Sequence, residues 1–257
     1  MPLKHSLRIL RVAWILMLAA ATSAFAADEL HWLSDYDGTI SGRYRVRMTL
    51  SFNGEEIDGV YFYATQLKDI HLKGHLTEGN IIVLDELDDT GKAVARFEGR
   101  FQEHDSQGHV AGKLEREVIT GFWRKLDSSE KLPLYLSMTD GVYGSLANRY
   151  ASSGCKDDAL IHRMAFRFWH AVKTGDKKSV AALISYPICV RISGRPATVA
   201  NPAELVSSYD AIFSPNYRRD IANAPPRNMF ARHEGIMLGN GDVWFDANGK
   251  VIALNND

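Results

Sequence analysis

Polar and apolar residues alternate through Arg43-Tyr44-Arg45-Val46-Arg47-Met48-Thr49-Leu50-Ser51-Phe52, and Asn53-Gly54 follows directly. A period of two is that of a β-strand with one apolar and one polar face. Asn-Gly is the strongest short signal for a two-residue hairpin turn. Residues 43–54 therefore predict a strand and the turn that leads into its antiparallel neighbour.

The same alternation recurs along the first half of the chain, at residues 70–76, 93–101 and 110–115. Short turn sequences separate these segments, and short connections make consecutive strands antiparallel neighbours. About seven or eight such strands predict an all-β antiparallel meander over residues 27–138, either a small barrel or a curled sheet. Glycines in mid-strand, such as Gly74 and Gly99, indicate strong curvature or close backbone approach.

Beyond a linker expected at residues 139–156, the apolar period becomes 3.6. Apolar residues from Leu160 to Val172 share one face of a helix, and Gly175 ends it. The pattern further predicts a helix at 177–183, a strand at 188–192, a helix from Asn201 to about Phe213, and strands near 235–238, 242–245 and 251–254. Residues 157–257 are therefore expected to form an α+β domain.

This second half resembles the NTF2-like superfamily. The resemblance lies in Phe166-Arg167-Phe168-Trp169-His170-Ala171-Val172-Lys173-Thr174-Gly175-Asp176, in Val180-Ala181-Ala182-Leu183-Ile184 and in Gly239-Asn240-Gly241-Asp242-Val243-Trp244-Phe245. Over about residues 155–257 it implies a cone of curved sheet around a long helix, made shallow by short terminal strands. It implies little about function, because NTF2-like proteins include isomerases, dehydratases, binding modules and scaffolds.

Residues 1–26 have the pattern of a cleaved signal peptide. Three basic residues, Lys4, Arg8 and Arg11, precede an apolar run from Val12 to Ala21. Ala24-Phe25-Ala26 then offers the small residues that a signal peptidase recognises. The run is shorter than the ~20 residues of a membrane span. The sequence thus predicts a periplasmic or secreted protein with no membrane span after cleavage.

Composition argues against several classes of function. The formal net charge is −1, and it becomes −4 without residues 1–26, which hold three basic residues and no acid. A mildly acidic chain is a poor nucleic-acid binder. There is no Gly-x-Ser-x-Gly elbow, phosphate loop, dinucleotide fingerprint or Cys-x-x-Cys pair. No cofactor is expected, and a non-enzymatic function is favoured over an enzyme.

The two cysteines, Cys155 and Cys189, suit an oxidising compartment. A disulfide between them would close a loop of about 34 residues and contribute about 2–4 kcal/mol. The alternative is a pair of free thiols.

Three further groups are candidates for chemistry. If the second half forms a cone, four residues are expected to line its pocket, where they could bind a ligand or transfer protons: Tyr209, Asp210, His233 and Trp244. The alternative is that they occupy core and turn positions. His104 and His109 flank a turn and could hold a metal with Asp105, the alternative being a solvated turn. His162 and His170 lie eight residues apart on the expected helix, about 12 Å along its axis, and are interpreted as surface residues.

Arg43, Arg45 and Arg47 form a basic stripe on one sheet face. It predicts a docking surface for an acidic partner; the alternative is pairing across strands with Glu86, Glu98 or Glu115.

The sequence as a whole favours an exported, non-enzymatic binding protein that engages a secreted protein or an envelope component, with an inhibitor included in that class. Two alternatives stay open: an isomerase or hydrolase with an NTF2-like pocket, and a structural or assembly factor of the envelope.

Overall fold

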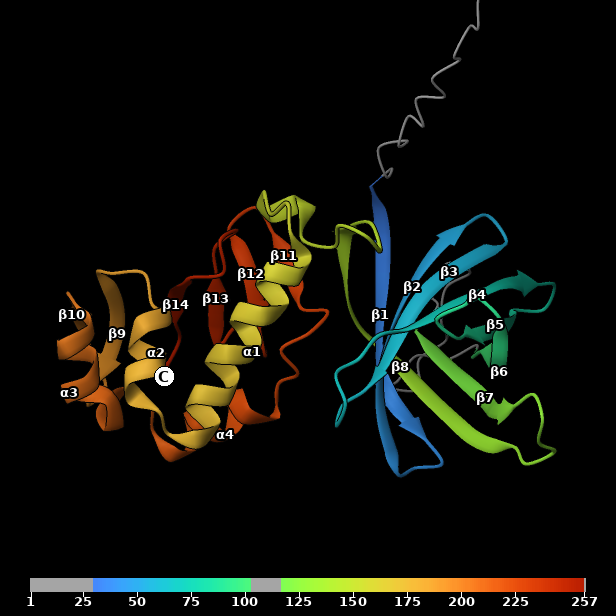
Figure 1. The fold of residues 1–257 in the computed structure, drawn as a ribbon, viewed down its shortest axis with the longest axis horizontal. Helices are drawn as coiled ribbons and strands as arrows, with labels where there is room; N and C mark the ends of the chain where they lie inside the picture. The colour runs from blue at the N-terminus through green and yellow to red at the C-terminus, as the bar shows by residue number, and fades with distance from the viewer. Residues whose placement is uncertain (1–29, 103–116, 257) are drawn as a thin grey trace, which may run out of the picture.

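Eight strands of the first half close into an antiparallel barrel, and an α+β part follows it (Figure 1). The computed structural model describes residues 30–102 and 117–256. The predicted signal peptide, His104, His109 and the strand expected at 110–115 lie outside these residues. No described helix has the length and apolar character that crossing a membrane requires.

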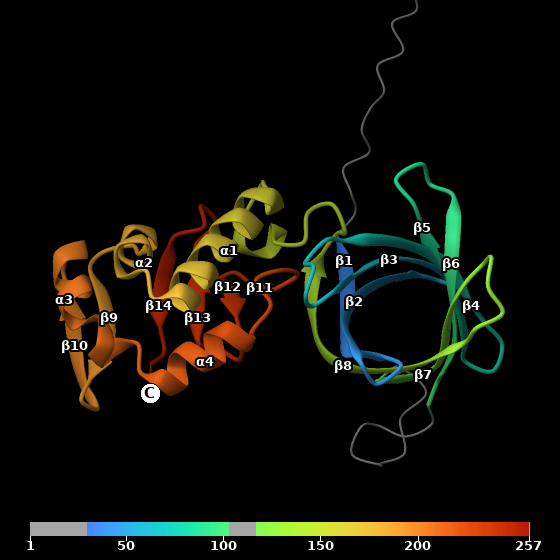
Figure 2. The same cartoon turned by 60° about the horizontal axis from the view of Figure 1, so that its bottom comes forward.

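Each barrel strand pairs with the next, and β1 pairs with β8 to complete the circle (Figure 2). The bounds are β1 (His31–Ile40), β2 (Tyr44–Asn53), β3 (Glu56–Tyr63), β4 (Ile70–Thr77), β5 (Ile81–Leu87), β6 (Ala93–Phe101), β7 (Val118–Lys125) and β8 (Leu132–Gly144).

The barrel interior is a packed apolar core. Val46, Met48 and Leu50, predicted to share one face of their strand, belong to a buried cluster to which all eight strands contribute. A Cβ built on Gly74 would lie 1.9 Å from the main-chain oxygen of Val83, so only a glycine fits where these strands approach. The prediction that mid-strand glycines mark close approach is confirmed at this position.

The second part contains four α-helices and two separate sheets among the described residues. Its elements are η1 (Ala151–Ser153), α1 (Asp158–Thr174), α2 (Lys177–Leu183), β9 (Ile188–Ile192), β10 (Arg195–Val199), α3 (Pro202–Ile212), α4 (Pro215–Asn223), β11 (Phe230–Arg232), β12 (Gly235–Leu238), β13 (Val243–Phe245) and β14 (Val251–Leu254).

Helix α1 packs on the four-stranded sheet β11–β14, as Figure 1 shows. The ring centroids of Phe168 on α1 and Phe245 on β13 lie 5.8 Å apart in a T-shaped arrangement. Asp157 caps the helix through Leu160 N–H, and Gly175 ends it in the left-handed conformation. The predicted helices near 160–172, 177–183 and 201–213 and the predicted terminal strands are confirmed.

The predicted fold class is nevertheless wrong. The first half does form a small barrel, one of the two alternatives, but the second half is not an NTF2-like cone. Strands β9 and β10 form a sheet of their own, and α3 and α4 separate it in the chain from β11–β14. Strands of three or four residues span only about 10–13 Å, too short to curve around a 17-residue helix about 26 Å long.

Two smaller expectations also change. Strand β8 continues to Gly144, paired with β1 at His31, so residues 139–144 of the expected linker are sheet. Helix α4 was not predicted, although Ser214 caps it and Pro215 occupies its first turn, which is a recognised sequence signal for a helix start.

Candidate binding site between the barrel and the α+β part

Arg149 and Asp35 form a buried ion pair between the connection after β8 and the outer face of β1. Asp35 is fully buried and Arg149 is 3% exposed. Arg149 Nη1 and Nη2 donate to the two carboxylate oxygens of Asp35, and Thr49 Oγ1 donates to Asp35 Oδ1 over 2.6 Å. Arg149 Nε donates to the main-chain oxygen of Met229 over 2.8 Å. One side chain therefore joins the barrel to the segment before β11.

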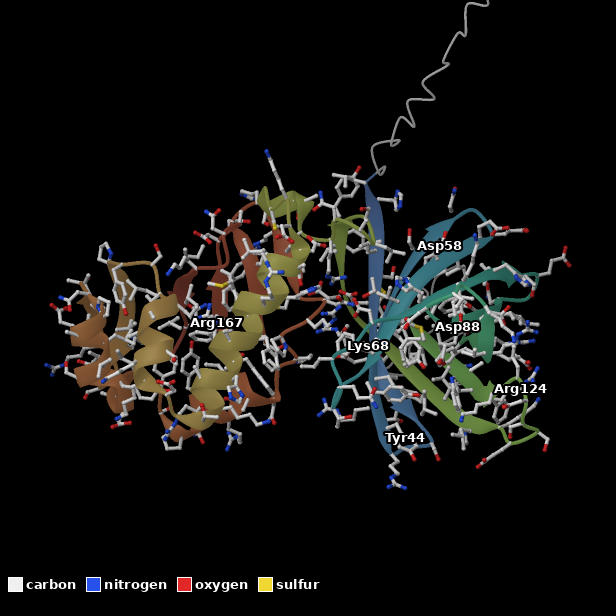
Figure 3. All side chains as sticks on the ribbon, viewed as in Figure 1. Tyr44, Asp58, Lys68, Asp88, Arg124 and Arg167 are labelled. Carbon is white, nitrogen blue, oxygen red and sulfur yellow. The ribbon has the colours of Figure 1, made fainter. Side chains whose placement is uncertain are left out.

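A second ion pair joins the same two parts. Arg227 Nε donates to Asp69 Oδ1 over 2.6 Å, and Arg227 Nη2 to Asp69 Oδ2 over 2.5 Å. Asp69 lies in the β3–β4 connection, and Arg227 lies between α4 and β11. Figure 3 labels Lys68, next to Asp69, at the boundary between the two parts. The bidentate geometry fixes the position of this connection against the α+β part.

A cavity of about 360 Å³ lies between the two parts, beside both ion pairs. Its barrel wall includes Leu33 and Val60 from the outer faces of β1 and β3. Its other wall comprises residues of three segments of the chain: Leu146, Ala147 and Arg149; Lys156 to Ala159 with His162; and Arg227 with Asn228. His162 and Arg227 also line an adjoining hollow of about 270 Å³ along α1. Both side chains thus stand where the two spaces meet.

Burial sets the protonation of His162, and a hydrogen bond with Tyr150 holds its ring. Met229 N–H donates to Tyr150 Oη over 3.2 Å, and Tyr150 Oη lies within hydrogen-bond distance of His162 Nε2, at 2.9 Å. Burial, with Arg227 and Arg149 nearby, lowers the pKa of His162 to about 4. At neutral pH the ring is therefore neutral. His162 is partly buried, less exposed than the sequence predicted, whereas His170 is exposed.

Asp158 holds the connection after β8 against the start of α1. Its carboxylate oxygens accept Arg149 N–H over 2.6 Å and Tyr150 N–H over 3.3 Å. Burial raises the pKa of Asp158 above its ordinary value, and the two N–H donors act in the opposite direction.

Asn228 carries an unused donor at the cavity. Its side chain lines the cavity, the residue is 4% exposed, and Nδ2 has no hydrogen-bond partner among the described residues. A buried donor without an acceptor costs about 1–3 kcal/mol. Asn228 also has a φ of 47°, a left-handed conformation that asparagine tolerates better than most residues.

The four pocket residues predicted from the sequence do not line this cavity. Tyr209 is fully buried and stacks on Phe213 at 4.6 Å. Asp210 is exposed and pairs with Lys177 at 2.7 Å. His233 is exposed beside Glu234, and Trp244 lies under the guanidinium of Arg232 at 4.9 Å. They belong to α3, a turn and β13, because the cone that would have gathered them does not form.

The arginine stripe is not a uniform free surface. Arg43 stacks on Tyr44, with 5.3 Å between guanidinium carbon and ring centroid, and Arg45 is exposed. Arg47 is partly buried and lies 3.5 Å from Asp37 on β1. Of the acidic partners expected, Glu86 accepts from Tyr61 and Trp123, Glu98 pairs with Arg124, and Glu115 lies outside the described residues.

The predicted disulfide is not formed. Cys155 is buried just before α1, and Cys189 is exposed on β9, and both are free thiols. Figure 1 shows these elements at different ends of the α+β part.

Sequence reasoning did not identify the residues of the two ion pairs beside the cavity: Asp35, Asp69, Arg149 and Arg227. They lie outside the patterns that the alternation singled out, and their partners are 114 and 158 residues away. A sequence signal exists only for Asp157 and Asp158, acidic residues at a helix start.

No protein-family model, curated protein or solved structure matches this chain. The resemblance of residues 155–257 to the NTF2-like superfamily therefore stays a prediction. The cone that it implied is not formed by the described residues.

Proposed function

We propose that this chain is an exported, non-enzymatic binding protein whose ligand occupies the cavity between the barrel and the α+β part. The observation that carries the proposal is the cavity itself, about 360 Å³ and flanked by two Arg–Asp pairs. That volume is within the usual range of small-molecule sites, about 300–1,000 Å³. Of the two partners that the sequence predicts, a secreted protein or an envelope component, the cavity favours a small molecule such as an envelope component.

The polar groups around the cavity favour binding over catalysis. Both oxygens of Asp69 accept from Arg227, and those of Asp158 accept main-chain N–H groups. These carboxylates are committed to holding the walls in place. A preorganised wall lowers the entropic cost of binding. The signal-peptide pattern of residues 1–26 supports a periplasmic or secreted location.

Filling the cavity tests the proposal. Ala159 lines the cavity on the exposed side of the first turn of α1, so Ala159→Trp is expected to abolish ligand binding with little loss of stability. The measurement is nuclear magnetic resonance of the purified protein against a library of small polar fragments. Fragments that bind should shift the amide signals of Ala147, Ala159 and Asn228, and these shifts should vanish in the variant.

Ala211→Trp is the matched control. Ala211 is an exposed alanine on α3, remote in the fold from the cavity, and its replacement should leave binding unchanged. Fragments that bind Ala159→Trp as well as they bind the wild type would place the site elsewhere and refute the proposal.

A further inference from the structure

Helix α1 exposes a basic face that also carries a large aromatic side chain. From Ala159 to Thr174 the helix contains no acidic residue. Beyond its first turn, exposed side chains recur at intervals of three or four residues and so form one line along the helix. We call this line the α1 stripe: Arg163, Phe166, Arg167, His170, Lys173 and Thr174. The whole chain has a formal net charge of −1, so positive charge is concentrated on this face.

The cations of the α1 stripe are available to a partner. Arg167, which Figure 3 labels, has a weak contact with the sulfur of Met164 at 3.9 Å and no ion pair with a described residue. Lys173 lies over the ring of Trp169, 4.4 Å from its centroid. Arg163 is 3.7 Å from an aspartate, but both side chains are more than half exposed. Such an exposed pair contributes little, so Arg163 can exchange its partner.

The hollow of about 270 Å³ beside α1 offers space for an apolar group next to these cations. Three apolar side chains line it: Leu67 from the β3–β4 connection, Phe166 from α1 and Pro226 from the segment before β11. Phe166 is 45% exposed. Arg227 also lines the hollow but is held by its bidentate ion pair, and the lining contains no acidic residue.

These features fit a peptide segment better than a membrane surface or a small anion. A helix that lies in a membrane interface presents an apolar face, whereas the apolar residues of α1 are buried and Phe166 is its one exposed large apolar side chain. A small anion requires cations that converge, but Arg163 and Lys173 lie about 15 Å apart along the helix axis. An extended peptide of about five residues covers that distance.

We propose that the α1 stripe binds a short acidic peptide segment of a partner protein. One aromatic or aliphatic side chain of the peptide enters the hollow beside Phe166, and its acidic side chains lie over Arg167 and Lys173. The proposal goes beyond the proposed function, because this surface lies beside the cavity and requires no ligand in it. The charges of the stripe are exposed, so binding is weak and decreases as salt is added.

Titration of the purified protein with the peptide Phe-Glu-Asp-Glu-Asp, followed by nuclear magnetic resonance, tests the proposal. The peptide should shift the amide signals of Leu67, Phe166 and Arg167. Replacing its four acids by their amides should weaken binding at least tenfold, since the attraction to the stripe is lost. Replacing its phenylalanine by alanine should weaken binding about fivefold, since the hollow is left unfilled.

Two charge reversals locate the site. Arg167→Glu changes an exposed side chain, so folding is preserved, and it should weaken the peptide at least tenfold by placing like charges together. Arg195→Glu makes the same change at an exposed arginine of β10 and is the matched control. It should leave the affinity unchanged, because β10 lies apart from α1 (Figure 1).

Three results would overturn the proposal. Equal affinity for the acidic peptide and its amide version would show that the charges do not drive binding. Equal losses in Arg167→Glu and Arg195→Glu would show that only the overall charge matters. Absence of peptide binding would also refute it, including the case in which vesicles of phosphatidylcholine and phosphatidylglycerol bind through the α1 stripe. The fragment test of the cavity follows the separate signals of Ala147, Ala159 and Asn228, so the proposed function stands or fails independently.

Discussion

Arg149→Met is expected to lower the free energy of unfolding by about 3–5 kcal/mol, the cost of leaving one buried charge without its partner. Asp35 is fully buried, and in the variant only Thr49 would still donate to its carboxylate. The cost arises from the uncompensated carboxylate more than from the lost attraction. Urea unfolding followed by circular dichroism measures it.

Two comparisons isolate the role of burial. Arg227→Met breaks a bidentate pair whose side chains are about a quarter exposed, and it should cost only about 1 kcal/mol. Asp35→Asn combined with Arg149→Met removes both charges and should be less destabilising than the sum of the two single changes. If Arg149→Met costs no more than Arg227→Met, the buried pair is not what stabilises the contact between the two parts.

Acidification should destabilise the protein through His162, by about 3 kcal/mol between pH 6.5 and pH 4. The pKa of His162 falls from its ordinary 6.5 to about 4 in the folded protein, mainly because the ring is buried. Across this window the unfolded chain binds a proton at His162 that the folded protein does not bind. Unfolding is therefore favoured as the pH falls, and the contribution is absent above pH 6.5.

His162→Gln isolates this contribution, because a glutamine amide can hydrogen-bond with Tyr150 Oη as donor or as acceptor. The stability of the variant should depend less on pH than that of the wild type between pH 6.5 and pH 4. The neighbouring groups Tyr150, Arg149, Arg227 and Asp69 are present in both proteins, so the comparison changes His162 alone. His170→Gln, an exposed change on the same helix, should retain the wild-type dependence. Parallel stability curves for wild type and His162→Gln would show that His162 is not the group responsible.

Local sequence patterns predicted the structure correctly wherever a residue's environment is set by its near neighbours in the chain. The alternation in residues 43–52 correctly placed Val46, Met48 and Leu50 in the core, since successive strand residues face opposite sides. Asp157 and Gly175 bound α1 because capping depends on residues within one turn. The prediction of a cone was wrong because a cone requires β9–β10 and β11–β14 to form one sheet, and no local pattern specifies whether they do.

The sequence by itself determined several strands of the barrel, among them β2, β4 and β6, the helix α1 and the terminal strands, because each follows from periodicity and turn chemistry over a few residues. Only the tertiary structure decided where the candidate site lies. Arg149 meets Asp35 across 114 residues, and Arg227 meets Asp69 across 158. No regular spacing in the sequence reveals such pairs, because Coulomb attraction and burial act through space. The partner of a buried charge is therefore known only once the barrel and the α+β part are in contact.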